Sequence, residues 1–421
     1  MGDWREGGGK SDMTMNQLGE ATGFGNPDLG PSQEGAPAPL ARFWSGKPPV
    51  VLQVIPALET GGAERGCVDV ALALADSGAT PLVASEGGGL TRELDRAFVR
   101  HFKLPLATKN PLKIRRNAKI LTKIIRDFGV DIVHARSRAP AWSAWAACQE
   151  TGAKFMTTFH APYNFSNDLK KWYNSVMARG ERVIAVSDFV RRHVAENYGV
   201  GPDRLRLIHR CYDPAVFSPD RVSAARMIQL AAKWRLPDDK PVVLLPGRLT
   251  RWKGQTVLID ALAQLNRRDV HCVLAGSDQG RRGFTQELEA RIRRAGLDGL
   301  VHIAGHCADM AAAYALSTVV VSASREPEAF GRVIVEAQAM GKPVIVSDIG
   351  AVKETVLAGE TGWVVPPDDP AALADALGHA LSLTPEQQDA VGERTRAFVE
   401  AHFTKDRMCA DTLAVYAELV G

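Results

Sequence analysis

Two glutamates, Glu328 and Glu336, lie eight positions apart in the segment EAFGRVIVE, which is otherwise largely apolar. A pair of carboxylates forms the catalytic acid and base of a glycoside hydrolase, in which the two groups lie about 5 to 9.5 Å apart on either side of the bond that is cleaved. Eight residues of helix rise about 12 Å, and a non-helical Glu328 lengthens the gap further. The spacing therefore favours two carboxylates that bind different parts of one elongated ligand over an acid and base pair.

The residues between the two glutamates predict a turn that leads into a helix. Gly331 allows the backbone to approach a ligand closely, and RVIVEAQAMG is typical of a helix that ends at Gly341. The N-terminus of that helix presents free N–H groups and the positive end of the helix dipole. We expect it to face a phosphate that lies between the two carboxylates.

Two cations lie in the segment PGRLTRWKG, which comes directly after an apolar run. Arg248 follows the run, and Lys253 is expected at the start of the next helix. A bidentate arginine and a lysine at the end of a strand are suited to neutralising a diphosphate. The alternative, a pair of solvated surface cations, stays open from the sequence.

A glycine-rich turn, ETGGAER, follows the first apolar run of the ordered chain. Gly61 and Gly62 permit a tight turn into a helix whose N-terminus faces an anion. The turn lacks the G-x-G-x-x-G spacing of a dinucleotide site and the G-K-[ST] of a P-loop. A plain tight turn between a strand and a helix is the equally weighted alternative.

The elements that must position these groups alternate along the chain. Short, continuously apolar runs are separated by amphipathic helical stretches, which predicts parallel sheets covered by helices on both faces. The expected strands of the first series are PVVLQVIP, TPLVASEG, HFKLPL, VDIVHARS, KFMTTFHA, RVIAVSDF and RLRLIHR, and those of the second are PVVLLPGR, VHCVLAGSD, VHIAGH, TVVVSASR, PVIVSDIG and GWVVPP.

Two doubly wound, Rossmann-like α/β domains facing across a deep cleft follow from this pattern. At 421 residues the chain exceeds what one core usually organises. The expected divisions are a disordered tail at 1–47, which holds ten glycines, a first domain at 48–215, a second at 216–390, and terminal helices at 391–421 that fold back over the first domain. Ligands in such sheets bind beyond the carboxyl ends of the strands.

Composition limits the class of protein. With 45% apolar residues, 24% charged residues and a net charge of +3, the chain resembles an ordinary soluble protein, and nucleic acid is not among the expected partners. The six cysteines are far apart, as in a reducing compartment. No apolar run reaches the roughly 18 residues that span a bilayer. We therefore expect a cytoplasmic protein.

At this point the chain resembles the family-4 retaining glycosyltransferases, the glycosyl transferases group 1, of the GT-B fold. The resemblance runs from about Val50 to Gly421 and depends most on the E-x7-E motif of Glu328 and Glu336. The segments GGAER, HAR, TTFHA and GRLTRWKG add to it in the order in which that family has them.

The resemblance implies that the second domain binds a nucleotide-diphosphate sugar. Glu336 would accept hydrogen bonds from the ribose and Glu328 from the transferred sugar, while Arg248 and Lys253 would hold the diphosphate. Further donor-binding residues by resemblance are Gly61, Gly62, Cys307 in a turn that reads the base, Phe330, Gly331, Arg332 and Val333.

The resemblance also implies catalysis without a protein nucleophile, mostly by positioning and electrostatics. His160 resembles the family's histidine near the sugar, although by position it could equally be a hydrogen-bonded residue at a strand end. Catalytic roles are thus expected for His160, Arg248, Lys253 and Glu328. The sequence contains no D-x-D motif, and neither a metal nor another cofactor is expected.

The acceptor is expected to be a glycan or a lipid-linked molecule in the synthesis of cell-envelope polysaccharide or lipopolysaccharide. The segment 109–129 mixes seven basic residues with aliphatic ones. Such a helix could lie on an anionic membrane surface, which would make the protein peripheral on the cytoplasmic membrane. A solvated helix with its apolar face on the first sheet is at least as well supported.

Two rival functions share this fold. A GT-B nucleotide-sugar epimerase would use the same donor, and a non-catalytic sugar-nucleotide-binding protein would keep only the binding. The context of the E-x7-E motif favours a transferase over the first. The presence of Arg248, Lys253, Glu328 and Glu336 together argues against the second.

Overall fold

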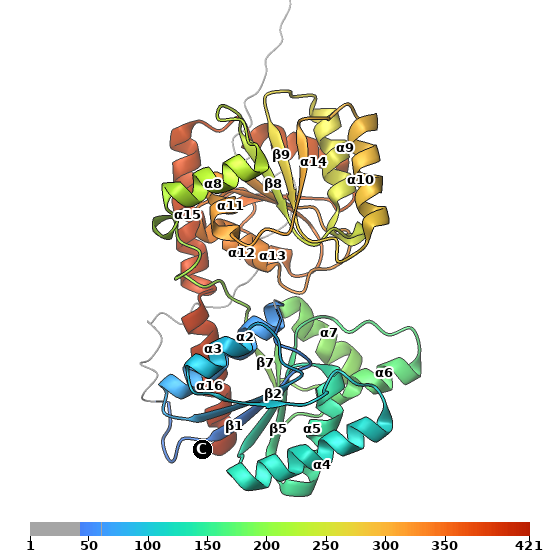
Figure 1. Cartoon of the computed structure of the whole chain (residues 1–421), viewed down its shortest axis with the longest axis vertical. Coiled ribbons are helices and arrows are strands. Elements are labelled where there is room, and N and C mark those ends of the chain that lie inside the picture. The colour runs from blue at the N-terminus through green and yellow to red at the C-terminus, as the bar shows by residue number, and fades with distance from the viewer. Residues whose placement is uncertain (1–42, 60) are drawn as a thin grey trace, which may run out of the picture.

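The structure, a computed structural model, describes residues 43–59 and 61–421 and contains two parallel sheets, one in each half of the chain (Figure 1). All thirteen strands predicted from the sequence are present. The first sheet consists of β1 (Val50–Val54), β2 (Thr80–Ser85), β3 (Arg100–Lys103), β4 (Ile132–Ala135), β5 (Lys154–Phe159), β6 (Arg182–Ala185) and β7 (Leu205–Leu207). The second consists of β8 (Val242–Pro246), β9 (His271–Ala275), β10 (Val301–Gly305), β11 (Val319–Ser322), β12 (Val344–Ser347) and β13 (Gly362–Val365).

Both sheets have the strand order of a doubly wound fold, as expected. The first runs β3-β2-β1-β4-β5-β6-β7 and the second β10-β9-β8-β11-β12-β13. The order reverses between β1 and β4 in the first sheet and between β8 and β11 in the second. Loops diverge on either side of such a reversal and leave space for a ligand at the carboxyl ends of the strands.

Helices cover both faces of each sheet, which is why the central strands are mostly apolar. Strands β4, β8, β9, β11 and β12 are buried along their whole length. The helices of the first domain are α2 (Gly62–Asp76), α3 (Thr91–Arg96), α4 (Pro111–Phe128), α5 (Arg138–Thr151), α6 (Asp168–Ser175) and α7 (Asp188–Tyr198). Those of the second are α8 (Ala224–Trp234), α9 (Gln255–Leu265), α10 (Arg282–Arg294), α11 (Met310–Leu316), α12 (Arg332–Ala339), α13 (Val352–Thr355) and α14 (Pro370–Ala380).

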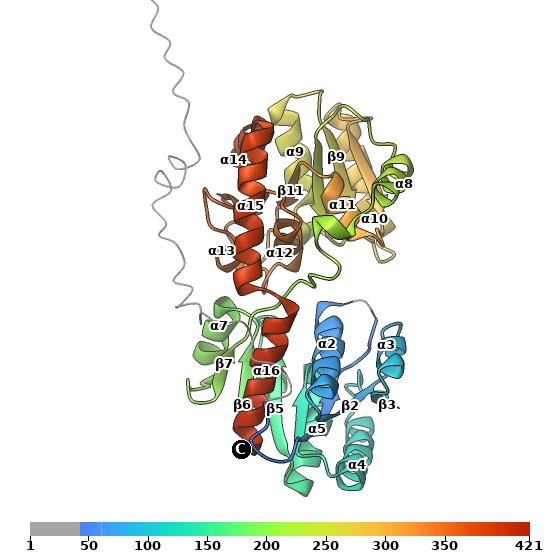
Figure 2. The ribbon, with the colours of Figure 1, turned by 90° about the vertical axis from the view of Figure 1, so that its left-hand side faces the viewer.

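The last two helices divide between the domains. Helix α15 (Pro385–His402) packs against α12 of the second domain, and α16 (Lys405–Val420) packs against α2 of the first (Figure 2). The predicted segment 391–421 therefore does not fold back as one unit, because its first helix stays with the second domain. Leu413 and Tyr416 of α16 are fully buried in the core of the first domain.

The predicted tail at 1–47 lies almost wholly outside the described residues. Its last part is ordered, contrary to that expectation. The Trp44 indole donates to the Ser77 carbonyl oxygen at 3.0 Å, and Phe43 and Trp44 pack on the core that contains α16. These two large aromatic side chains supply the apolar area that holds this short segment in place.

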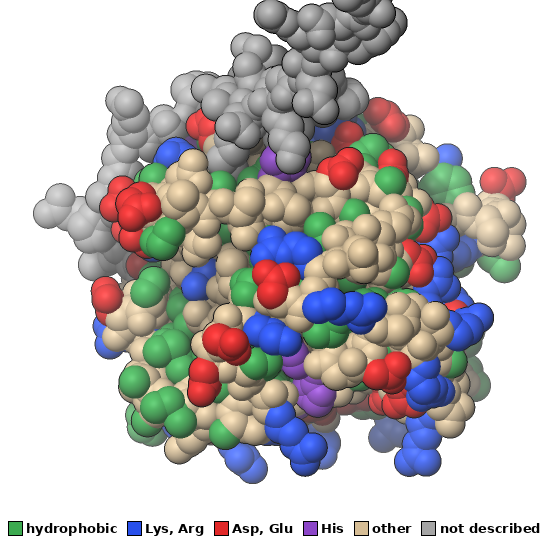
Figure 3. All heavy atoms as spheres, turned by 90° about the horizontal axis from the view of Figure 1, so that it is seen from above, with side chains coloured by type: hydrophobic (Ala, Val, Ile, Leu, Met, Phe, Trp, Pro, Cys, Tyr) green, Lys and Arg blue, Asp and Glu red, His purple; other side chains and the backbone are tan. Residues whose placement is uncertain are grey.

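One face of the molecule, at the end of the second domain that is distant from the first, carries side chains of all types. Basic, acidic and hydrophobic side chains are intermingled there (Figure 3). Among the described residues, no helix has the length and apolarity that crossing a bilayer requires.

Candidate functional site

Lys253 and Glu328 meet where the strand order of the second sheet reverses. Lys253 ends the 3₁₀ turn Arg251–Lys253 after β8, and Glu328 lies in the loop after β11. The Lys253 ammonium donates to Glu328 Oε1, which also accepts from the Ser324 hydroxyl at 2.6 Å. The two charged side chains are only 12% and 10% exposed. The carboxylate is thus fixed in place while its second oxygen stays available for another donor.

The backbone of Glu328 is held as firmly as its side chain. It forms an isolated bridge with Gly350, and its carbonyl oxygen accepts from the Ala351 N–H at 2.9 Å. A Cβ atom on Gly350 would collide with that carbonyl group, and the φ of +75° suits glycine. Gly350 was not predicted as a site residue, although its place just after β12 is a signal that could have identified it.

Glu336 lies on α12, one turn beyond Arg332. Its Oε2 accepts from the Tyr314 hydroxyl at 3.0 Å, and its Oε1 accepts from the Arg332 guanidinium at 2.8 Å. Burial raises the pKa of Glu336, and the charge of Arg332 opposes that rise. Burial next to this carboxyl raises the pKa of Tyr314 well above its usual value. Glu336 is therefore a desolvated acceptor, and its partner Tyr314 is a further residue that the sequence did not reveal.

The remaining predicted residues of the second domain differ in their surroundings. Arg248 is exposed, with its guanidinium 5.8 Å from the centre of the Trp252 ring. The side chain of Cys307 is buried, and burial raises the pKa of its thiol. Phe330 is also buried, with its ring 5.4 Å from that of Phe403. Cys307 and Phe330 consequently offer a ligand their backbone rather than their side chains.

Gly331 and Val333 belong to the start of α12. Gly331 caps the helix with a φ of +85°, in the left-handed region, and Val333 occupies its first turn. The first N–H groups of a helix have no partner within it. Helix α12 therefore begins between Glu328 and Glu336 in the sequence, and the phosphate that its N-terminus is expected to face stays a prediction.

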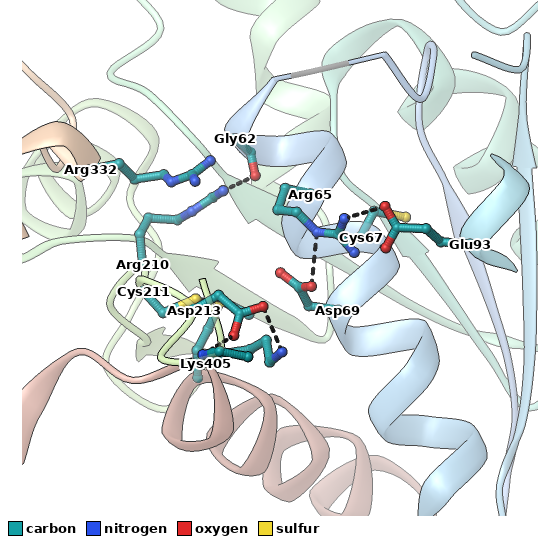
Figure 4. Close-up of polar contacts among 12 residues, drawn as sticks. Gly62, Arg65, Cys67, Asp69, Glu93, Arg210, Cys211, Asp213, Arg332 and Lys405 are labelled. Carbon is teal, nitrogen blue, oxygen red and sulfur yellow. Dashed lines mark hydrogen bonds and ion pairs between the residues drawn. The ribbon is translucent and has the colours of Figure 1, made fainter. Parts of the chain in front are cut away.

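Gly61 and Gly62 begin α2 in the first domain. The Gly61 N–H donates to the Glu64 carboxylate at 2.7 Å and is thus already engaged. A Cβ atom on Gly62 would lie 3.1 Å from Arg210 and 3.2 Å from Arg332. Figure 4 shows both arginines pointing to this end of α2, one from each domain. The glycine turn therefore admits two guanidinium groups at close range.

His160, in the loop after β5, lies beside the same arginine. Its Nδ1 is 2.9 Å from one terminal nitrogen of Arg210, and the other terminal nitrogen of Arg210 donates to the Gly62 carbonyl oxygen. Burial, followed by the charges of Arg210 and Arg136, lowers the pKa of His160 well below its usual value. Burial also lowers the pKa of Arg210 to about 10. Arg210 escaped prediction because no motif contains it, although it follows β7 at the sheet edge where site residues were expected.

Four buried nitrogen atoms near this glycine turn have no hydrogen-bond partner among the described residues. They are Arg136 NH2, His160 Nε2, Arg210 Nε and Arg332 Nε. Buried polar groups are almost always paired, by protein or by ordered water, so four unpaired groups in one region need an explanation. All four are donors or charged groups, so a ligand rich in oxygen acceptors suits this region.

Glu354 connects the two domains beside the site. From α13 it accepts hydrogen bonds from the N–H groups of Asp188 at 2.6 Å and Phe189 at 2.9 Å, at the N-terminus of α7. The His209 ring lies 3.1 Å from the same carboxylate. A carboxylate at a helix N-terminus is favourable, and this one fixes the second domain against the first.

Two family profiles match the chain in succession. Residues 60–216 match glycosyltransferase family 4, and residues 227–398 match glycosyl transferases group 1. A glycosyltransferase structure from Rickettsia africae is 39% identical, with a TM-score of 0.83, over 89% of this chain and 99% of that one. The Anabaena protein HepE, solved with UDP-glucose, shares the fold at 23% identity, with a TM-score of 0.76, over 88% of this chain and 99% of that one.

Curated relatives are similar over the same region. A D-inositol 3-phosphate glycosyltransferase of Xylanimonas cellulosilytica is 31% identical over 68% of this chain and 72% of that protein. A phosphatidyl-myo-inositol mannosyltransferase of Mycobacterium leprae is 33% identical over 60% of this chain and 64% of that protein. Among other relatives the covered share of their own length falls to 50%.

The two Rossmann-like domains and the loops between them define a GT-B glycosyltransferase. Within that class, the chain belongs to glycosyltransferase family 4 of the glycosyl transferases group 1. It is an enzyme of the transferase type, as the resemblance implied. Relatives named as transferases do not favour the epimerase or the non-catalytic alternative.

Proposed function

We propose that this glycosyltransferase moves a hexosyl-type sugar from a nucleotide-diphosphate sugar to a glycan or lipid-linked acceptor, with retention of configuration. The observation that carries the proposal is the arrangement of Glu328 and Glu336 on either side of the α12 N-terminus, each held by a cation. Structures of HepE with UDP and with UDP-glucose support a donor of this kind.

The donor would extend across these residues. Arg248, Lys253 and the N–H groups of Gly331, Arg332 and Val333 would bind the diphosphate. Glu336 would accept from the ribose, and the free oxygen of Glu328 would accept from a hydroxyl of the sugar. The backbone around Cys307 would contact the base, and Phe330 would shape the turn. Gly61 and Gly62 would close over the phosphates from the first domain.

Catalysis would consist of positioning and charge stabilisation. As the bond to the sugar breaks, negative charge develops on the leaving diphosphate, where Arg248, Lys253 and the helix N-terminus lower the barrier. An oxygen of that diphosphate would take the proton from the acceptor hydroxyl on the same face of the sugar. We propose no metal and no other cofactor, because Arg248, Lys253 and the helix N-terminus supply the positive charge.

The acceptor would bind to the first domain. Relatives are named for D-inositol 3-phosphate and for phosphatidyl-myo-inositol, which supports an acceptor with a polar, phosphate-bearing head. Assembly of a cell-envelope polysaccharide or of lipopolysaccharide is the setting we propose, in the cytoplasm or at its membrane.

The part of the protein that we propose to contact a membrane differs from the one that segment 109–129 suggested. Three of the six Leu and Ile residues of α4, namely Leu121, Ile124 and Ile125, are buried in the core of the first domain, and Ile120 packs against that core. The apolar stripe of α4 is therefore largely covered by the first domain. Leu112 at its start is 74% exposed, and Leu169 and Trp172 of α6 are 73% and 55% exposed. We propose that these three residues and the exposed cations of α4 contact anionic lipid.

Thermal unfolding in the presence of UDP-, GDP- and ADP-sugars tests the donor assignment. A ligand at about 100 times its dissociation constant adds roughly 2.7 kcal/mol, so one sugar nucleotide should raise the Tm clearly. A Tm unaffected by all three would count against the proposal. With a responsive donor, NMR of the product should show transfer with retained configuration, and release of a free epimerised sugar would favour the epimerase instead.

A further inference from the structure

Arg210 joins three loops at the carboxyl edge of the first sheet. It follows β7, contacts the Nδ1 atom of His160 after β5, and donates to the carbonyl oxygen of Gly62 after β1. The residue is only 9% exposed. Among the described ion pairs none joins Arg210 to a carboxylate. A buried, uncompensated guanidinium is costly, which indicates a use other than stability.

The chemistry of the guanidinium determines the direction of its bond to His160. Arginine can only donate hydrogen bonds, so the Nδ1 atom must accept at 2.9 Å. An imidazole that accepts at Nδ1 is neutral and carries its single proton on Nε2. That Nε2 atom is buried and has no partner in the described part of the chain.

The groups around His160 reinforce this state. His134 of β4, Arg136 directly after β4 and Arg210 beyond β7 lie close enough to interact with the ring, whereas the Tyr163 hydroxyl interacts with the backbone of His160. The charges that act on the ring are both those of arginines, Arg210 and Arg136, and both disfavour a second proton. Arg136 is itself held by a 2.6 Å bond to Gln53.

We propose that Arg210 is a positioning residue that keeps His160 neutral, with its proton on Nε2 directed at the substrate. This inference rests on the proposed function. His160 would donate a hydrogen bond to a hydroxyl or ring oxygen of the transferred sugar and would not act as a base. The proton of the acceptor hydroxyl would pass to the leaving diphosphate oxygen, so the protonation of His160 would not change during transfer.

Nitrogen NMR of the full-length protein with labelled histidine tests the proposal without any substrate. The spectrum of a His160→Gln variant identifies the signals of His160. We expect a protonated Nε2 and an unprotonated Nδ1 from pH 6 to pH 9. A proton on Nδ1, or a doubly protonated ring at pH 7, would overturn the assignment even if the enzyme proved to be a glycosyltransferase.

Kinetics of two Arg210 variants provide the second test. Arg210→Met should lower kcat by about tenfold and shift an acidic limb of the pH profile upward, because the pKa of His160 rises when the charge of Arg210 is removed, while burial and Arg136 still hold it below the ordinary value. Arg210→Lys, which can still donate to Nδ1, should recover part of the activity and move that limb back to lower pH. Arg206→Met is the matched control, because Arg206 pairs with Glu418 on the outer side of α16.

The outcomes separate the two proposals. Loss of kcat without the shift of the acidic limb, or no recovery with lysine, would reduce Arg210 to a structural residue and contradict the inference. A correct tautomer in a protein that transfers no sugar from any nucleotide would instead refute the proposed function, on which the role of the tautomer depends.

Discussion

Lys253 and Glu328 lie 75 residues apart in the chain and form an ion pair that is almost closed to solvent. Their loops follow β8 and β11, which are neighbours in the sheet because the strand order reverses between them. Removing two charges from water is costly, so a buried ion pair is weak evidence for a role in stability. The pair is therefore the first target for mutation.

Replacement of Lys253 or Glu328 by alanine should lower kcat/KM by well over tenfold, because each loses a donor contact and leaves its partner buried without a counter-charge. The double variant should be little worse than either single one, since the two act as a unit. Arg251→Ala is the control, because Arg251 belongs to the same turn but pairs with Glu287 on the surface. Full activity in both single variants would refute the assignment of the site.

The buried histidine of the first domain predicts a loss of stability in acid. His134 lies between the Tyr416 hydroxyl and the Thr158 hydroxyl, each at 2.7 Å, and burial lowers its pKa well below 6.5. Since the unfolded chain binds the proton more readily, this contribution is present above about pH 6.5 and is lost as the pH falls below it, by up to about 1.4 kcal/mol per pH unit.

Urea unfolding at several pH values measures this effect. His134→Gln should be less stable than the wild type at pH 7.5 by about 1 to 3 kcal/mol, because its neighbours lose their partner. Between pH 6.5 and pH 5 its stability should decline less steeply than that of the wild type. Equal slopes would show that His134 takes up its proton equally well in the folded protein.

The contact of Glu354 with α7 should limit relative motion of the domains. Glu354→Ala removes the acceptor of two backbone N–H groups, those of Asp188 and Phe189. Hydrogen exchange at these two amides should become faster by about tenfold or more, because they are left without a partner at a helix N-terminus. Glu360→Ala, an exposed change on the same loop region, should leave both rates as they are. Unchanged rates in Glu354→Ala would mean that the domains are held elsewhere.

Binding to anionic vesicles should depend on both charge and apolar contact. At about 0.01 M salt, where the Debye length is about 30 Å, the protein should sediment with the vesicles, and at about 0.15 M it should sediment less. Lys113→Glu with Arg116→Glu should abolish the salt-dependent part, and Trp172→Ser should weaken binding at both concentrations. A protein that ignores such vesicles at low salt would refute the membrane proposal.

The strands were predictable because burial on both faces imposes continuous apolar runs, which can be read locally. The positions of Glu328, Lys253 and Gly331 were predictable for a related reason, since residues that follow such runs lie at one edge of the sheet. Arg210 and Tyr314 were not, because their contacts join strands and helices far apart in the sequence. Trp44 was assigned to the tail because the residues before it are rich in glycine, and its contacts with Ser77 and with the core around α16 are not visible in the local sequence.

Segment 109–129 illustrates a limit of the amphipathic pattern. An apolar stripe predicts that one face of a helix is buried, but the same stripe can pack against a sheet or lie on a membrane. In the structure the sheet covers Leu121 and Ile125. Only the exposure of side chains in the folded molecule separates the two cases.

Helix α16 affects the order in which the molecule can be completed during synthesis. The core of the first domain includes Leu413 and Tyr416, which follow the whole second domain in the sequence. Translation releases these residues only after the whole second domain has been made. The core of the first domain therefore stays incomplete until α16 has left the ribosome, and a nascent chain that stops after α15 would lack the residues that complete it.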